Sequence, residues 1–205
     1  MSQSPQKSYH DFVIRDGQFV GQFEDMYRAC SDPWMQSEQP NPYSRTATAI
    51  NIRRFGIQSV LECGCGLGYY SDFLTRQTGA KITGIDTSKT AILKARELFP
   101  ELRFEVGNVQ DLEPWGDFDA ILFAEITWYI LPEFKKILEQ MRRFYAGKYL
   151  LHNLVFYKGS QKYGNDYFTN LQQFREWMPF PAVAWMEATT ESDSTIETAS
   201  VFRIE

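Results

Sequence analysis

A buried strand that runs directly into a glycine-rich turn most constrains how this chain can fold. The strand is the apolar run Ser59–Cys63, and the turn has glycines at alternate positions: Gly64, Gly66 and Gly68. A helix is predicted next, at Tyr69–Arg76, so the segment forms the first half of a βαβ unit. Without Cβ atoms, the glycines let a ligand approach the backbone closely. We therefore expect a ligand site at this end of the sheet.

Strands and helices alternate from about residue 58 to residue 178, which is typical of an α/β fold. Strands are predicted at Ser59–Cys63, Lys81–Asp86, Arg103–Val106, Phe118–Glu125 and Lys148–Phe156. Most are continuous apolar runs, as expected for parallel strands covered by helices on both faces. The link between the third and fourth strands is short, so its crossover helix should be missing or reduced to a turn.

Helix signals separate these strands. Thr87 and Ser88 can cap a helix, and Pro132 opens another helix at Glu133–Tyr145. A further helix is predicted at Asn165–Met178, where a proline follows. Helices and strands together predict a doubly wound sheet.

The two ends of the chain depart from this alternation. The runs Ala182–Thr189 and Thr195–Ile204 predict an antiparallel hairpin. The stretch up to Phe55 lacks strand-like alternation and predicts two helices, at about Gln18–Cys30 and Ser44–Phe55. The loop that joins them has three prolines and few apolar anchors.

These elements predict one α/β domain with a Rossmann-like, doubly wound fold. Its sheet should have seven strands, mostly parallel with the antiparallel hairpin at the C-terminal end. We expect residues 56–205 to form this domain and residues 1–55 to form a helical lid over the ligand site.

Acidic residues stand at the ends of the first two predicted strands. Glu62 lies two residues before the first glycine, and Asp86 closes the second strand. Together with the GxGxG spacing, this pattern resembles the first motif of class I S-adenosylmethionine-dependent methyltransferases. Tyr69 stands where the dinucleotide fingerprint would have its third glycine. The resemblance covers about residues 58–157 and implies S-adenosylmethionine as the cofactor.

The resemblance also implies roles for single residues. Glu62 suits the cofactor's ammonium group, and Asp86 can accept both ribose hydroxyls. Asn108 stands where the family usually has an acidic residue at the adenine amine, and the Val109 backbone could serve the adenine edge. Further cofactor contacts are expected from Cys63, Gly64, Gly66, Gly68, Thr87 and Glu125.

A narrower resemblance concerns the segment Glu125–Leu131, which is similar to that of the nodulation-factor N-methyltransferases. Those enzymes methylate an amine on a chito-oligosaccharide. They also carry an Asp-Pro-Trp before the core, as this chain does at Trp34 and the two residues before it. The similarity implies that Trp34, Tyr43 and Arg45 form a lid over the cofactor, with Arg45 free to pair with its carboxylate. It also favours a carbohydrate acceptor.

Two residues could act as a general base if the acceptor is a hydroxyl. Glu125 is predicted at the carboxyl end of the fourth strand, facing the methyl-transfer space. His152 lies in the fifth strand, where a hydrogen-bonded core histidine is the alternative interpretation. Three cysteines and two histidines in the chain make a metal site unexpected.

Charge and composition restrict the partners. The net charge of −5 disfavours nucleic acid, because phosphate binding needs a basic surface. No apolar run is long enough for a membrane span, so we expect a cytoplasmic monomer or dimer acting on a small-molecule or carbohydrate acceptor. Two alternatives stay open: a non-catalytic S-adenosylmethionine-binding module and an NAD-dependent oxidoreductase.

Overall fold

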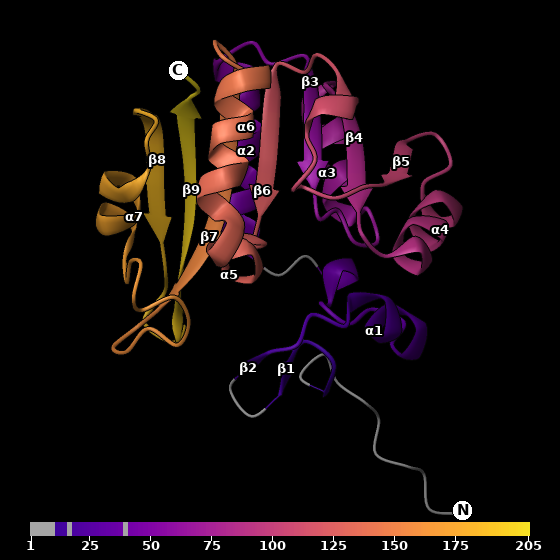
Figure 1. Cartoon of the computed structure of the whole chain (residues 1–205), viewed down its shortest axis with the longest axis horizontal. Coiled ribbons are helices and arrows are strands. Elements are labelled where there is room, and N and C mark those ends of the chain that lie inside the picture. Colours follow the sequence, from indigo (N-terminus) through magenta and orange to yellow (C-terminus); the bar gives the residue numbers. More distant parts are fainter. Residues whose placement is uncertain (1–10, 16–17, 39–40) are drawn as a thin grey trace, which may run out of the picture.

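Seven strands form one mixed sheet in the order β5-β4-β3-β6-β7-β9-β8 (Figure 1). The computed structural model describes residues 11–15, 18–38 and 41–205. The strands are β3 (Ser59–Cys63), β4 (Lys81–Asp86), β5 (Arg103–Val106), β6 (Ala120–Ala124), β7 (Tyr149–Tyr157), β8 (Ala182–Ala188) and β9 (Thr195–Arg203). Pairing is parallel from β5 to β7, and β9 is antiparallel to both of its neighbours. This sheet is the predicted one.

The chain reverses its direction of winding between β3 and β6. It runs outward through β4 and β5 and then crosses back to place β6 on the other side of β3. In open α/β sheets, ligands bind beyond the carboxyl ends of the strands at such a switch point. Glu62 and the glycine turn lie on β3 at this point.

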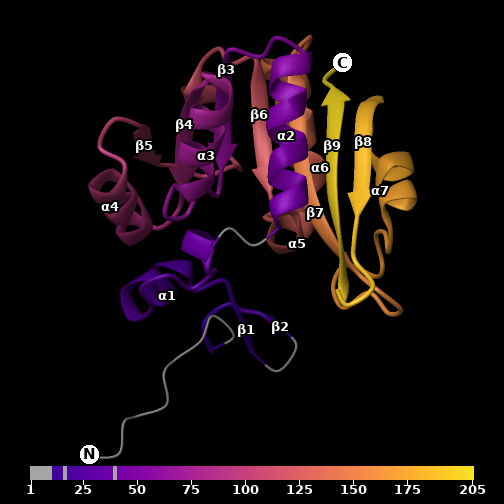
Figure 2. The same cartoon turned by 180° about the vertical axis from the view of Figure 1, so that it is seen from behind.

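Helices cover both faces of the sheet. On one face lie α2 (Pro42–Arg54) and α3 (Tyr69–Thr78), which are in front of the sheet in Figure 2. On the other face lie α6 (Phe134–Phe144) and α7 (Leu171–Trp177). A further helix, α4 (Lys89–Leu98), packs on β4 and β5 at the edge of the sheet. The predicted helices at 133–145 and 165–178 are therefore present, the second only in its last part.

An apolar core lies between the sheet and each helical layer. Phe134, Ile137, Leu138 and Met141 of α6 are spaced as one helical face, and all four are buried. Each such side chain contributes about 1.5–3 kcal/mol when it leaves water. Packing of this kind holds the carboxyl ends of the strands in fixed positions.

Local signals place the remaining elements. The Ser88 hydroxyl accepts a hydrogen bond from the Ala91 N–H at 3.1 Å, which confirms the predicted cap of α4. Between β5 and β6 the described chain has only the 3₁₀ turn η3 (Glu113–Trp115), as expected from the short link. The helices α5 (Thr127–Ile130) and η4 (Leu131–Glu133) lead from β6 into α6.

The N-terminal segment differs from the prediction. A helix was expected at Gln18–Cys30, but α1 covers only Phe23–Ala29. Before it, β1 (Ile14–Arg15) and β2 (Gln18–Phe19) form a short antiparallel pair, and the Val20 N–H donates to the Val13 carbonyl at 2.8 Å. The helical prediction was wrong here because a backbone hydrogen bond to a distant partner overrides local propensity.

Residues 11–15 and 18–38, with the 3₁₀ turn η2 (Gln36–Glu38), lie beyond the carboxyl ends of the parallel strands (Figure 1). By contrast, α2 packs against the sheet beside α3, so it belongs to a covering layer. Residues 1–10 of the expected lid are outside the described residues. We refer to residues 11–15 and 18–38 as the lid segment, and their role as a lid stays a prediction.

Polar contacts at both ends of α1 attach it to α4. The Glu24 carboxylate accepts from the Ser88 hydroxyl at 2.7 Å and from the Thr90 hydroxyl at 2.8 Å. The Lys94 ammonium donates to the carbonyls of Tyr27 and Cys30 at the other end. These contacts hold the lid segment over the strand ends.

Candidate functional site

A cavity of about 970 Å³ lies between the lid segment and the carboxyl ends of the parallel strands. Nine of the residues predicted from the sequence line it: Trp34, Arg45, Glu62, Gly64, Asp86, Thr87, Asn108, Val109 and Glu125. Five others do not line it: Tyr43, Cys63, Gly66, Gly68 and His152. The fold thus assembles most of the predicted site from segments more than 90 residues apart.

Asp86 holds the glycine turn in place. Its Oδ2 accepts from the Gly66 N–H at 3.0 Å, and its Oδ1 accepts from the Ser88 N–H at 2.8 Å. Burial raises the pKa of this carboxyl group, while the two N–H groups act in the opposite direction. Each carboxylate oxygen keeps a second lone pair, so Asp86 can also accept from a ligand's hydroxyls.

The glycines of the turn make room for protein side chains as well as for a ligand. Gly64, Gly66 and Gly68 have φ angles of +74°, +56° and +82°, which side chains rarely adopt. A Cβ atom at Gly68 would lie 2.5 Å from the Phe104 ring. Protein side chains therefore occupy the space beside Gly66 and Gly68, and cofactor contacts of these two glycines stay a prediction.

Gln36 is a site residue that the sequence did not reveal. Its Oε1 accepts from the Leu67 N–H at 2.8 Å, and its Nε2 donates to the Cys65 carbonyl at 3.3 Å. Asp32 orients it by accepting from the Gln36 N–H at 2.8 Å. This amide links the lid segment directly to the glycine turn.

Glu62 is the buried acid at the end of β3. It is 1% exposed, and the Ser71 hydroxyl of α3 donates to its carboxyl group. Burial raises its pKa to about 7, against the opposing effects of Ser71 and the nearby Arg45 cation. A cationic ligand group would favour its ionised form.

Arg45 reaches the cavity from α2 and is 7% exposed. Its guanidinium lies 4.9 Å from the centre of the Tyr70 ring, and burial lowers its pKa. The Nη1 atom is buried and has no hydrogen-bond partner among the described residues. A buried cation with a vacant donor is suited to a ligand carboxylate.

Asn153 of β7 supports this arginine. Its Oδ1 accepts from the Tyr70 hydroxyl at 2.8 Å, and its Nδ2 donates to the Thr48 hydroxyl at 3.0 Å. Tyr70 is thereby fixed beneath the Arg45 guanidinium. Asn153 lines the cavity and was not predicted, although it follows His152 directly.

Glu125 follows β6 with an unusual backbone conformation. Its φ is +61°, a left-handed value that is uncommon outside glycine and is found at functional sites. Burial raises its pKa to about 8, and the negative charge of Glu197 adds to this shift. Its Oε1 is buried without a hydrogen-bond partner in the described part of the chain.

His152 is placed in the core instead of at the cavity. It is 1% exposed, its Nε2 lies 2.7 Å from the Thr127 hydroxyl oxygen, and its ring centre is 4.5 Å from that of Phe174. Burial lowers its pKa to about 3. Side chains alternate along β7, so Asn153 faces the cavity side and His152 faces α6 and α7. The expectation that His152 faces the acceptor is corrected.

The far part of the cavity has aromatic walls. Trp128, Tyr157 and Tyr163 line it, and the Lys162 ammonium lies 4.7 Å from the centre of the Tyr157 ring. Tyr43, expected in the lid, is 47% exposed and outside the lining. These walls come from α5, which carries Trp128, and from β7 and the loop after it.

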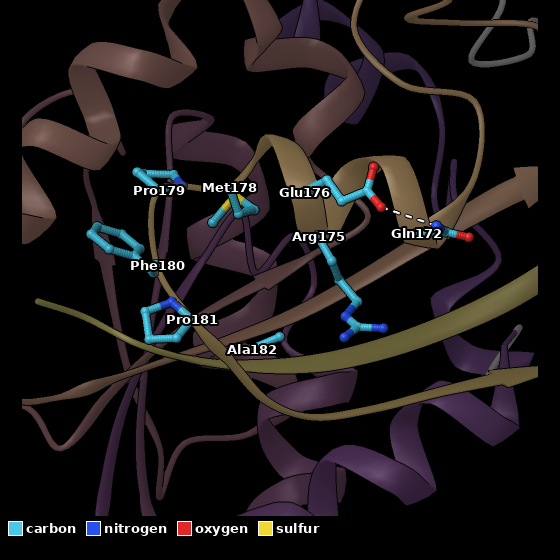
Figure 3. Close-up of a pocket in the computed structure, with 8 residues that line it drawn as sticks. All are labelled: Gln172, Arg175, Glu176, Met178, Pro179, Phe180, Pro181 and Ala182. Carbon is cyan, nitrogen blue, oxygen red and sulfur yellow. Dashed lines mark hydrogen bonds between the residues drawn. The ribbon is translucent and has the colours of Figure 1, made fainter.

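A second hollow of about 470 Å³ lies between α7 and β8. In Figure 3 its side chains come from α7, the chain leading to β8 and the first residue of β8, and Gln172 donates to Glu176 at 3.0 Å. It contains none of the predicted site residues, so the large cavity is the candidate site. Within the described ranges no three metal-ligating side chains gather, and no helix is long and apolar enough to cross a membrane.

Comparison with known proteins gives matches in the central part of the chain. A family model described as a methyltransferase domain matches residues 60–146. Trans-aconitate 2-methyltransferase from Afipia carboxidovorans is 36% identical over 93 residues, which are 43% of this chain and 36% of that enzyme. The Rhizobium meliloti enzyme of the same name is 33% identical over 81 residues, or 39% and 31%. This chain thus spans about a third of these relatives.

Solved structures share the fold over most of the chain. The N-methyltransferase NodS from Bradyrhizobium japonicum, in complex with S-adenosyl-L-homocysteine, has a TM-score of 0.66 at 18% identity over 90% of this chain and 98% of its own. The [4+2]-cyclase SpnF has a TM-score of 0.61 at 15% identity, over 81% and 84%. At these identities the likeness concerns the fold alone.

Proposed function

We propose that this chain, a class I S-adenosylmethionine-dependent methyltransferase by family model and fold, methylates an oxygen or nitrogen of a small-molecule or carbohydrate acceptor. The observation that carries the proposal is the cavity at the switch point, where Glu62, Asp86 and Arg45 meet. S-adenosylmethionine supplies the methyl group as a sulfonium cation.

The lining residues fit this cofactor. Asp86 supports binding of the ribose hydroxyls, and Asn108 and Val109 lie on the next loop, where the adenine would be held. Glu62 suits the ammonium group, and the vacant Nη1 of Arg45 suits the carboxylate. Trp34 and Gln36 of the lid segment cover this end of the cavity.

Methyl transfer is an in-line displacement that removes the positive charge of sulfur. The protein must therefore align the acceptor with the methyl group and exclude water. The lid segment supports exclusion of water, and the aromatic walls support alignment of an acceptor. Glu125 is the titratable group at the junction between the cofactor and acceptor parts of the cavity.

Neither the sequence relatives nor the family model identifies the acceptor. That model ends at residue 146, whereas the acceptor walls include Asn153, Tyr157 and Lys162. The trans-aconitate relatives match over less than half of this chain. A cytoplasmic location, a monomeric or dimeric state and the absence of a nucleic-acid partner stay proposals, which rest on the composition.

Calorimetry with S-adenosyl-L-homocysteine and with NAD tests the proposal. S-adenosyl-L-homocysteine should bind, and Asp86→Ala should weaken it by about 1.5–3 kcal/mol, the range for a hydrogen bond to a charged group. Binding of NAD alone would favour an oxidoreductase. Transfer of label from S-adenosylmethionine into the small molecules of a cell extract separates an enzyme from a non-catalytic binding module.

A further inference from the structure

We propose that the acceptor is an amine and that the Glu125 carboxyl group binds its nitrogen at the methyl-transfer end of the cavity. This inference rests on the methyltransferase function proposed above and names the acceptor class for that site. It also assigns Glu197 a supporting role behind Glu125.

The first observation is the position of the Glu125 carboxyl group. Glu125 lines the cavity directly after β6, and the Val155 N–H donates to its carboxyl group. Oε1 has no partner among the residues described, although it is buried. An unpaired buried acceptor costs about 1–3 kcal/mol, which a ligand's N–H group would recover.

The second observation is the charge around Glu125. Glu197 of β9 lies close enough to raise its pKa and is itself held by the Ser44 N–H of α2, at 2.9 Å from Oε2. The Arg45 cation acts in the opposite direction and lowers the pKa of Glu125, but burial and Glu197 outweigh it. Burial beside Glu197 therefore disfavours a further negative charge at this corner, so a bound cation would stabilise the ionised form of Glu125, whereas a carboxylate acceptor would be repelled.

The third observation is the aromatic wall beside this corner. Trp128, Tyr157 and Tyr163 line the cavity. The ring of Tyr157 already contacts one cation, because the ammonium group of the exposed Lys162 lies over it. Aromatic faces attract cations, and alkylammonium groups gain most where water is excluded. The same wall can stack against the apolar face of a sugar or another ring on the amine.

The cation Arg45 would be the obvious partner for a carboxylate acceptor. Its guanidinium is fixed over Tyr70, and it lies among the cofactor residues, within the field of Glu62. We assign it to the cofactor's own carboxylate. The cation that the described lining leaves for an acidic acceptor is Lys162, which is exposed and lies over the Tyr157 ring instead of beside Glu125. The structure therefore favours an amine over the acid that the names of the sequence relatives suggest.

The reaction balances with the groups present. The Glu125 carboxylate takes a proton from the bound ammonium, and the N–H electron pair stays on nitrogen. This lone pair forms the N–CH₃ bond while the electrons of the C–S bond move to sulfur. The products are an N-methylammonium ion and neutral S-adenosyl-L-homocysteine, and Glu125 then passes its proton to water.

Sinefungin provides a probe that needs no knowledge of the acceptor. This analogue carries an amino group on carbon where S-adenosylmethionine has the S–CH₃ unit, so it places an ammonium at the transfer position. Wild type should bind sinefungin about ten- to a hundredfold more tightly than S-adenosyl-L-homocysteine. Glu125→Gln should abolish most of this preference, and Glu197→Gln should reduce it.

The matched control is Glu139→Gln on the exposed face of α6, which should leave the preference unchanged. Thermal unfolding of each variant checks that it is folded. If S-adenosyl-L-homocysteine binds and the preference for sinefungin is absent, or persists in Glu125→Gln, the amine inference is overturned. If neither ligand binds, the proposed function itself fails.

The chemical stability of the product gives an independent test. Label from S-adenosylmethionine is transferred by the wild-type protein into an extract's small molecules, and the product is treated with alkali. An N-methyl group keeps its label in alkali and also in hydriodic acid under conditions that cleave ethers, which would support the inference. A methyl ether survives alkali but releases labelled methyl iodide in hydriodic acid, and that result would overturn it. A methyl ester releases labelled, volatile methanol, and that result would overturn it.

Discussion

The Oε1 atom of Gln36 lies 2.5 Å from the position that a Cβ atom would take at Gly66. The Tyr27 hydroxyl lies at the same distance. A side chain at residue 66 would therefore displace both groups of the lid segment. The missing Cβ leaves room for the lid segment to contact the glycine turn.

Gly66→Ala should open this contact and weaken cofactor binding. The new methyl group would push Gln36 away from Leu67 and Cys65 and would strain a residue at φ +56°. The strain alone costs about 1–2 kcal/mol. Affinity for S-adenosyl-L-homocysteine and protease cleavage within 31–38 would be measured, and we expect lower affinity and faster cleavage.

Gly56→Ala is the matched control for that variant. Gly56 has a similar φ of +64° and no atom within 4 Å of its Cβ position among the described residues. It should lose similar stability without changing cofactor affinity. Equal effects of the two variants on affinity would show that the Gln36 contact has no role in binding.

Arg45→Gln should separate two ligands that differ in their amino-acid part. Affinity for S-adenosyl-L-homocysteine should fall by about 1.5–3 kcal/mol, because the cofactor's carboxylate loses a charged donor. Affinity for 5′-methylthioadenosine, which has no carboxylate, should stay within about twofold of wild type. Calorimetry measures both. Equal losses for the two ligands would contradict the carboxylate assignment.

Glu24→Gln should weaken the attachment of α1 to α4 in a pH-dependent way. Hydrogen bonds from Ser88 and Thr90 lower the pKa of Glu24 to about 2 from 4.5. Stabilisation by the carboxylate is therefore complete above about pH 4.5 and disappears as the pH falls through about 2. Denaturant midpoints of wild type and variant should differ at pH 7 and converge in acid. Glu101→Gln, on an exposed turn, should give no such difference.

His152→Gln should change the pH dependence of stability and leave that of catalysis unchanged. The pKa of His152 is about 3 in the folded protein and 6.5 without burial, so only the unfolded chain binds a proton between these values. Wild-type stability should fall below pH 6.5 by up to about 1.4 kcal/mol per pH unit. The variant should lack this contribution. If the profile of kcat/KM against pH lost an ionisation in the variant, His152 would instead be a catalytic base.

The sheet could be predicted because its signals are local. Each parallel strand is a short apolar run with a turn or helix cap after it, and Ser88 caps α4 as expected. The glycine turn and Asp86 then follow from the strand ends, since these meet at one edge of a parallel sheet. That reasoning located most of the cofactor part of the cavity.

The orientation of β7 could not be predicted in the same way. Its residues are apolar on both faces, so the period of two that would distinguish His152 from Asn153 is absent. A histidine attracts attention as a possible base, whereas Asn153 carries no comparable signal. Pairing with β6 and β9 decides which of the two faces the cavity.

Long-range contacts of single residues were also beyond the sequence. Gln36 meets the glycine turn through two backbone groups, and nothing in its neighbourhood marks it as different from other glutamines. The strands β1 and β2 have two residues each, too few for a strand pattern. Both features depend on tertiary packing.

The position of β9 bears on the order in which the protein can fold during synthesis. This last strand enters between β7 and β8, and Glu197 on it binds the Ser44 N–H across 153 positions of sequence. A nascent chain that ends before Thr195 has every strand of the cofactor part but no neighbour for the outer edge of β7. Contacts of such large sequence separation form late. We expect the acceptor end of the cavity to be completed only after β9 has left the ribosome.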